Sequence, residues 1–381
     1  MELDKKEALE LLKLMVTTNT VNPPGNEIVL AKKLQPLLEK EGLEVVIDEF
    51  MPGRANMVVT LPGADRSKKK LFFSGHLDTV PVGEVKWEHD PFAFEEKDGK
   101  IWGRGIADMK SGDAAALYSM VLLKRAGIVP KQDVVMAMTA GEETLSLGAT
   151  DFVKKDGMAT AGALVVCEPS GLKAYIAHRG AIWVKVEFFG KTSHGSMPEL
   201  GVNAVLHMYK FIHQIMQQRF TCAPDEILGM PSMSINKAIG GTATNVVPDY
   251  AYCEIDFRTI PGQTWADIKA FLDQALTKAA EGEADFRYQY AYMGKELPPM
   301  KCPENCKLPD ALDAAAGHKL VREGVRFFTD ASILVTTPDL PVVVIGPGES
   351  NQAHQPNEHI VVEQYYEAIR LYYNLMKDYE V

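Results

Sequence analysis

The sequence has few cysteines and no long apolar run, and both absences narrow what the chain can be. Its five cysteines are an odd number spread over 381 residues, which does not fit a disulfide framework. The longest apolar stretches, such as LPVVVIG at 340–346, have the length of a strand and not the roughly 20 residues of a membrane span. The acidic, amphipathic start MELDKKEALELLKLM lacks the features of a secretory signal. We therefore expect a cytoplasmic protein with reduced cysteines and no membrane segment.

Only Cys302 and Cys306, in CPENC, are closely spaced, and no second Cys or His pair completes a zinc site around them. Basic residues are outnumbered, with 40 Lys and Arg against 51 Asp and Glu. The formal net charge of -11 argues against a nucleic-acid partner, which requires an excess of Lys and Arg.

A hydrophobic content of 46% and a charged content of 24% are typical of a soluble globular protein. The length predicts two domains, or one large domain with an insertion.

The first part of the chain alternates helical and strand patterns. Several of the strands are apolar almost throughout, which predicts an α/β layer around a mostly buried sheet. The expected strands are 44–50, 56–63, 69–75, 133–141 and 162–169, and the expected helices are 4–16, 26–42, 109–127 and 145–157.

The pattern changes near residue 180 and changes back near residue 294. The middle part reads β-α-β-β-α-β, the order of a ferredoxin-like unit with one open sheet face. Afterwards a helix at 309–323, a strand at 340–346 and a helix at 361–378 resume the α/β pattern. We therefore predict an α/β domain formed by 1–179 and 294–381, interrupted by an inserted α+β domain at 180–293.

Acids and histidines gather where the predicted strands end. In open α/β sheets, the loops at the carboxyl ends of the strands are where ligands bind. The residues at or near these positions are His76 and Asp78, Asp108 among the glycines of GRGIADMKSG, Glu142 and Glu143, Glu168, and His354. One such residue is weak evidence, but the set of oxygen and imidazole donors suits a pair of divalent ions, most naturally zinc. The lack of cysteine in the set favours a catalytic site over a structural one.

The motifs SGHLDTVP, GRGIADMKSG, TAGEETLSLGA, VVCEPSG and AHQPNEHI are together specific. With them the sequence resembles the co-catalytic metallohydrolases that include succinyl-diaminopimelate desuccinylase, acetylornithine deacetylase, carboxypeptidases and aminoacylases. The resemblance covers nearly the whole chain. It implies a zinc-peptidase-like α/β catalytic domain with an inserted ferredoxin-like domain that serves as a lid and in dimerisation.

The resemblance also implies a role for each strand-end residue. His76 and Glu168 would bind one ion and Glu143 and His354 the other, with Asp108 as the bridge. Asp78 would accept the far N–H of His76, and Glu142 would be the general base. The two ions are expected to be zinc, with cobalt or manganese as alternatives.

In the inserted domain, the resemblance implies that His194 and Asn245 reach the active site of the partner subunit in a homodimer, where His194 stabilises the oxyanion. Arg179 and Arg258 match positions that grip a carboxylate of the substrate.

Nucleotide-binding, hydride-transfer and serine-hydrolase functions each lack a required residue. The leading prediction is a two-zinc hydrolase that cleaves an amide in a small N-acyl amino acid bearing a carboxylate. N-succinyl-diaminopimelate, a lysine-biosynthesis substrate, and N-acetylornithine are the leading substrates. A dipeptidase or carboxypeptidase is the nearest alternative. A non-catalytic metal-binding relative is a further alternative, but it would lack the base or a ligand, and none is missing.

Overall fold

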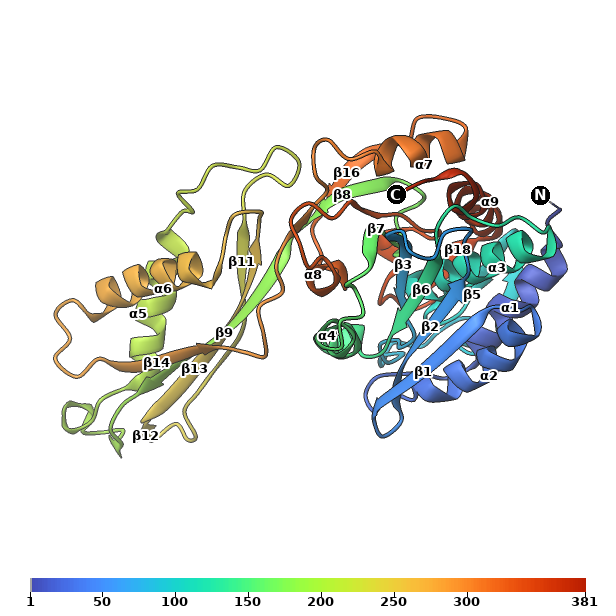
Figure 1. The fold of residues 1–381 in the computed structure, drawn as a ribbon. Helices are drawn as coiled ribbons and strands as arrows, with labels where there is room; N and C mark the ends of the chain where they lie inside the picture. The colour runs from blue at the N-terminus through green and yellow to red at the C-terminus, as the bar shows by residue number, and fades with distance from the viewer. Residues whose placement is uncertain (1) are drawn as a thin grey trace. The chain divides into compact units, whose positions relative to one another are not determined.

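The computed structural model describes residues 2–381, which divide into two compact units (Figure 1). The first unit comprises the chain up to Ala177 together with Lys301–Gly324 and Thr329–Val381. The second unit comprises His178–Met300 and Val325–Phe328. Among residues 2–381, no helix is both long enough and apolar enough to cross a membrane.

A mixed sheet of nine strands, counted within residues 2–381, forms the centre of the first unit. Its main order is β1-β2-β6-β3-β7-β17-β8-β15, with β16 paired to β8. The strands are β1 (Glu44–Met51), β2 (Arg54–Leu61), β3 (Lys70–His76), β6 (Val134–Thr139), β7 (Ala161–Val166), β8 (Ala174–His178), β15 (Met300–Lys301), β16 (Arg322–Val325) and β17 (Val342–Val344). The central strands β6, β3, β7 and β17 run parallel, and nearly all of their residues are buried, as their continuous apolar sequences predict.

Helices complete the hydrophobic core of the first unit. The almost wholly buried α3 packs against α1 and α9, while α2 contacts β1 and β2 (Figure 1). The helices are α1 (Lys5–Thr17), α2 (Glu27–Lys40), α3 (Ser111–Arg125), α4 (Leu147–Lys154), α7 (Leu308–Ala316), α8 (Ala331–Leu334) and α9 (Val362–Asp378). A small separate sheet joins β4 (Glu95–Lys97), β5 (Lys100–Trp102) and β18 (His359–Val361).

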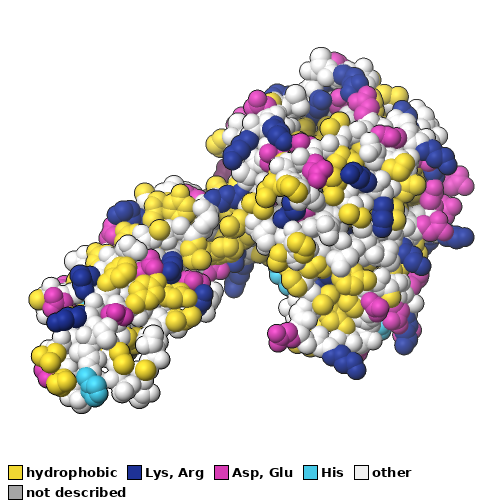
Figure 2. All heavy atoms as spheres, turned by 90° about the horizontal axis from the view of Figure 1, so that it is seen from below, with side chains coloured by type: hydrophobic (Ala, Val, Ile, Leu, Met, Phe, Trp, Pro, Cys, Tyr) yellow, Lys and Arg dark blue, Asp and Glu magenta, His cyan; other side chains and the backbone are white. Residues whose placement is uncertain are grey.

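The second unit is a four-stranded antiparallel sheet with two helices packed on it. Its elements are β9 (Gly180–Phe189), α5 (Ala204–Gln217), β11 (Ser232–Gly240), β13 (Tyr250–Thr259), α6 (Trp265–Ala280) and β14 (Arg287–Tyr292). The sheet order β11-β13-β9-β14 is that of a ferredoxin-like fold, as the sequence predicts. The side of this unit that is turned toward the viewer in Figure 2 mixes hydrophobic and charged side chains.

One helix and the bounds of the inserted domain differ from the prediction. The helix expected over 309–323 ends at Ala316, because Gly317 takes a left-handed conformation with φ of 76° and the chain then enters β16. The sequence assigns residues 178–179, 294–300 and Val325–Phe328 to the α/β domain, but all of them belong to the second unit. There the Phe328 ring packs edge-on against Trp183 and under the guanidinium of Arg258.

Candidate metal centre

The parallel strands of the first unit bring His76, Glu143 and Glu168 to one edge of the sheet. His76 is the last residue of β3 and pairs in register with Thr139, the last residue of β6. On the other side of β3, Ser74 is level with Val166, the last residue of β7. The loops after these three strands therefore leave the sheet together, and the side chains that follow them lie close to one another.

Two groups of donor atoms share one aspartate. In the first group, Nε2 of His76 lies 3.1 Å from Oδ1 of Asp108 and 3.7 Å from Oε1 of Glu168. In the second group, Nε2 of His354 lies 3.3 Å from Oδ2 of the same aspartate and 3.0 Å from Oε2 of Glu143. Within each group the three ligand atoms are all within 4.8 Å of one another. Asp108 thus turns one oxygen to each group.

The two groups differ in depth. His76 is 1% exposed and Glu168 is 5% exposed, whereas 52% of the His354 side chain is accessible. His354 also has a left-handed backbone with φ of 62°, a conformation that costs energy for a residue other than glycine. Such backbone strain is concentrated at functional sites, and the imidazole of this residue contacts Asp108 and Glu143.

The electrostatics of this cluster are those of an acidic site. Burial and the charges of neighbouring carboxylates raise the pKa of both Glu142 and Glu168 well above the ordinary value. Burial alone would lower the pKa of His76, but its hydrogen bond to Asp108 and the charge of Glu168 raise it well above its usual range. Hydrogen bonds to Asp108 and Glu143 raise the pKa of His354 to about 10.

Positive charge is what the cluster lacks. Within residues 2–381, the ion pairs of its carboxylates are made with the two imidazoles, and no lysine or arginine neutralises them. Because isolated charges are costly to bury, the cluster raises the affinity of its imidazoles for protons. Three carboxylates and two imidazoles, arranged as two groups with a shared aspartate, fit a pair of divalent cations that take nitrogen and oxygen ligands.

Glu142 lies beside this set without belonging to either group. It is 7% exposed, and with His76 and Glu143 it forms a third group of donors whose ligand atoms lie within 4.8 Å of one another. The adjacent Glu143 is also hydrogen-bonded to His354. Both glutamates therefore lie near His76, but Glu143 alone of the two also contacts His354.

The structure corrects the predicted contact of Asp78. The acceptor for Nδ1 of His76 is the backbone carbonyl of Asp78 at 2.9 Å, while the nearest carboxylate oxygen is 3.7 Å away. The Asp78 carboxylate instead accepts backbone N–H groups from Gly141 at 2.8 Å, Glu142 at 3.1 Å and Glu143 at 3.3 Å. A fourth hydrogen bond, of 2.8 Å, comes from the Asn22 side chain. Asp78 thus anchors the turn that carries both glutamates.

Glycine is required at the start of this turn. Gly141 has φ of 73°, and a Cβ there would lie 2.6 Å from Nη2 of Arg54. Arg54 is itself fixed by a buried ion pair with Glu27, at 2.8 Å. Asp78 therefore anchors the turn by hydrogen bonds, and the fixed arginine leaves no space for a larger residue at Gly141.

Glu358 is a residue that the sequence analysis missed. Its fully buried carboxylate accepts backbone N–H groups from Gly105 at 3.0 Å, Ala107 at 2.8 Å and Asp108 at 3.1 Å, and pairs with Arg104 at 2.6 Å. Burial raises its pKa to about 7 despite these partners. Glu358 thus fixes the loop that presents the shared aspartate. The only signal in the sequence was its place four residues after His354.

His194 and Asn245 are neighbours within the second unit. The short strands β10 (Ser193–His194) and β12 (Val246–Val247) pair, and the Gly195 N–H donates to the Asn245 carbonyl at 2.7 Å. Both side chains are exposed, and His194 Nδ1 contacts Ser196 Oγ at 2.7 Å. The structure thus brings these two predicted residues together on one surface.

The two predicted arginines of the second unit differ in availability. Arg179 is 7% exposed; its Nη1 donates to Ser232 Oγ, and its Nη2 donates to the carbonyls of Leu228 and Met230. With both Nη2 hydrogens taken, it has no pair of free donors for a carboxylate, which argues against the predicted bidentate grip. Arg258 binds Asp256 through Nε and Nη2, and no described contact takes its Nη1.

Comparison with known proteins places this architecture in a family. Residues 72–378 match the family model of peptidase family M20/M25/M40. Acetylornithine deacetylases of Edwardsiella ictaluri and Salmonella typhimurium are 30% and 31% identical to this chain over 315 residues, which are 81% of the chain and 80% of each relative.

The fold agrees with solved structures across almost the full length. Aminopeptidase PepT from Bacillus cereus superposes with a TM-score of 0.80 at 22% identity, covering 98% of both chains. An M20 family metallo-carboxypeptidase from Sulfolobus solfataricus superposes with a TM-score of 0.80 at 18% identity, covering 97% of this chain and 98% of its own. The chain belongs to peptidase family M20/M25/M40 and is a metal-dependent hydrolase.

Proposed function

We propose that this protein is a two-metal deacylase that hydrolyses the amide bond of a small N-acyl amino acid and releases a free amine. The observation that carries this proposal is the pair of donor groups that share Asp108, with Glu142 beside them and outside both. The relatives with 30% to 31% identity are named acetylornithine deacetylases, which favours an acyl amino acid as the substrate.

His76 and Glu168 would hold one ion, Glu143 and His354 the other, and Asp108 both, with zinc as the expected metal. When bound, the two ions supply Lewis-acid activation of the scissile carbonyl and of the attacking water. Glu142 would accept the proton of that water on a carboxylate oxygen and later deliver it to the nitrogen of the leaving amine. Its burial favours proton transfer, because a buried carboxyl takes up a proton more readily than an exposed one.

The second unit would contribute the remaining contacts. His194 and Asn245, which lie side by side, would serve the site of a partner subunit, where His194 donates a hydrogen bond to the developing oxyanion. Arg258, with its Nη1 available, would bind the carboxylate of the substrate. The lid and dimerisation roles of this unit belong to the same proposal.

Replacing each of the neighbouring glutamates should cause a different failure. We expect Glu142→Gln to lower kcat by about 10²- to 10⁴-fold while both ions stay bound, because it removes the proton acceptor and no ligand. Glu143→Gln should reduce the metal content from two ions to about one per chain, since it removes a ligand of one group. Activity assays and metal analysis of the two purified variants form a matched comparison. Full activity of the Glu142 variant would refute its role as the base.

Glu358 should act through the position of Asp108. In Glu358→Gln one acceptor oxygen becomes an NH₂ group that faces backbone N–H donors, so we expect metal affinity to fall by about 10- to 100-fold. The measurement is a metal titration against a competing chelator. Glu349→Gln, at an exposed glutamate in the same segment, is the control and should leave metal affinity unchanged. Equal metal affinity in both variants would contradict the positioning role.

A substrate panel distinguishes the deacylase from the peptidase alternative. Zinc-loaded protein should turn over N-acetylornithine, N-succinyl-diaminopimelate or related N-acyl amino acids faster than unblocked di- and tripeptides. The Glu142→Gln protein, assayed in parallel, controls for contaminating hydrolases. Turnover of peptides alone would overturn the deacylase proposal and leave the metal-dependent chemistry intact.

The proposed dimer should depend on the exposed face of α5. This face carries Leu206, Tyr209 and Met216, which are 55%, 63% and 54% exposed. The spacings of three and then seven residues place them along one side of the helix. A second copy of the chain would cover this apolar stripe. Sedimentation should show a dimer that Tyr209→Glu dissociates, whereas Val129→Glu, at a residue 61% exposed in the first unit, should not. A fully active monomer would contradict the proposal.

A further inference from the structure

Cys302 and Cys306 form a close pair in a segment of the sequence that contains none of the proposed catalytic residues. Their Sγ atoms lie 3.0 Å apart, and both cysteines are free thiols. Cys302 directly follows β15, and its N–H donates to the carbonyl of Ile176 in β8 at 2.8 Å. Cys306 lies two residues before α7, in a turn closed by its own N–H and the carbonyl of Pro303. The pair therefore joins the edge strand of the sheet to the start of a helix.

The two thiols are not equivalent. Cys302 is 8% exposed, whereas Cys306 is partly accessible. The hydrogen bond from Cys302, and to a smaller extent the N–H of Leu308, lower the pKa of Cys306 to about 7. The same contact and burial raise the pKa of Cys302 above its usual range. One thiol is thus accessible and readily ionised, and the other is protonated and shielded.

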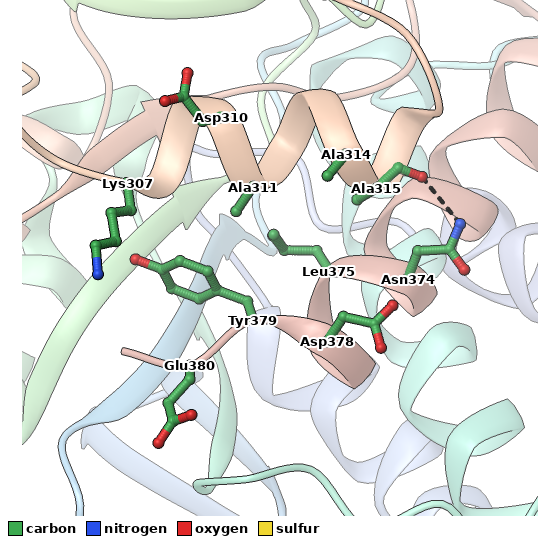
Figure 3. A pocket seen from close by; sticks show the side chains of 10 residues that line it. All are labelled: Lys307, Asp310, Ala311, Ala314, Ala315, Asn374, Leu375, Asp378, Tyr379 and Glu380. Atoms are coloured by element: carbon green, nitrogen blue, oxygen red, sulfur yellow. Dashed lines mark hydrogen bonds between the residues drawn. The ribbon is translucent and has the colours of Figure 1, made fainter.

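Residues beside the pair, but neither cysteine itself, line a neighbouring cavity. Tyr379, whose pKa is raised to about 12 by burial and by the charges of both cysteines, lines a cavity of about 430 Å³ between α7 and α9. Lys307, the residue after Cys306, lines the same cavity, and Figure 3 shows both side chains at one end of it. The other charged groups that act on Cys306 are Asp310 and Arg322.

We propose that Cys302 and Cys306 are a redox-active dithiol that a peroxide-class oxidant converts into a reversible disulfide. The sulfur atoms need to approach by about 1 Å to reach the bond length of about 2.05 Å, which the short CPENC turn can accommodate. The pair lies where the chain re-enters the first unit at Lys301, so the disulfide fastens that strand to the turn before α7.

The reaction balances with hydrogen peroxide as the oxidant. The Cys306 thiolate attacks one peroxide oxygen, the O–O bond breaks, and the hydroxide that leaves takes up a proton to become water. Cys306 is then a sulfenic acid, oxidised by two electrons. The Cys302 sulfur attacks the Cys306 sulfur, the S–O bond breaks, and a second water leaves with the thiol proton of Cys302. Two thiols and one peroxide thus yield one disulfide and two waters.

Peptide mapping of the intact, metal-loaded protein tests this proposal. After mild hydrogen peroxide treatment, the peptide that contains residues 302–306 should lose two hydrogens and resist alkylation until dithiothreitol is added. Cys222, a partly accessible cysteine outside the pair, is the internal control and should remain open to alkylation at the same dose. In the reduced protein, the alkylation rate of Cys306 should rise with pH through a midpoint near 7.

Two variants separate the steps. In Cys302→Ser, Cys306 should stop at the sulfenic acid, which dimedone traps, and in Cys306→Ser the remaining Cys302 should stay reduced. Oxidation of Cys222 at doses that leave both Cys302 and Cys306 alkylatable would overturn the proposal, as would a disulfide between either cysteine and a third one. These measurements do not depend on turnover, so they hold whether or not the deacylase proposal does.

Discussion

Buried carboxylates that accept successive backbone N–H groups hold the candidate metal centre together. Asp78 does this for Gly141, Glu142 and Glu143, and Glu358 does it for Gly105, Ala107 and Asp108. Hydrogen bonds to a charged acceptor contribute about 1.5 to 3 kcal/mol each, so three in one place can fix a loop that has no regular structure. These anchors fix the turns that carry Asp108, Glu142 and Glu143, whereas His76 is held by β3 itself.

The fold brings the metal-binding side chains to one place, and the hydrogen bonds of Asp78 and Glu358 fix the turns that orient them. Parallel strands end at one edge of the sheet, which places His76 and the loops of Glu142 and Glu168 together. The arrangement of the strands alone does not determine which way the side chains of two adjacent loop residues point. Because Asp78 holds the backbone on both sides of the Glu142 to Glu143 bond, one glutamate can face the deep group and the other His354. Different tasks for neighbouring residues follow from a fixed turn.

The sequence predicted those parts of the site that depend on the type of a residue and on its position at the end of a strand. Apolar strands followed by acids or histidines predicted the edge at which His76, Glu168 and Glu143 meet, and the β-α-β-β-α-β order predicted the second unit. It could not predict the role of Glu358, whose partners are backbone amides about 250 residues away in the chain. Because every residue except proline has a backbone N–H, the residue types do not reveal which backbone N–H groups a carboxylate will bind. The same limit explains Asp78, whose motif indicates a partner for His76 but not that its carboxylate holds another loop.

Arg179 shows the opposite limit, because the family resemblance implied a carboxylate-binding role that its surroundings do not allow. An arginine near a predicted site is a natural carboxylate ligand, but guanidinium groups are also used to satisfy buried carbonyls. Here the carbonyls of Leu228 and Met230 take both Nη2 hydrogens. Arg258 keeps a free Nη1 because its nearest partner, Asp256, lies two residues away on its own strand and engages only one side of the guanidinium. Which guanidinium N–H groups are already hydrogen-bonded can be seen only in the structure. This difference separates Arg179, which supports the fold, from Arg258, which remains able to bind a ligand.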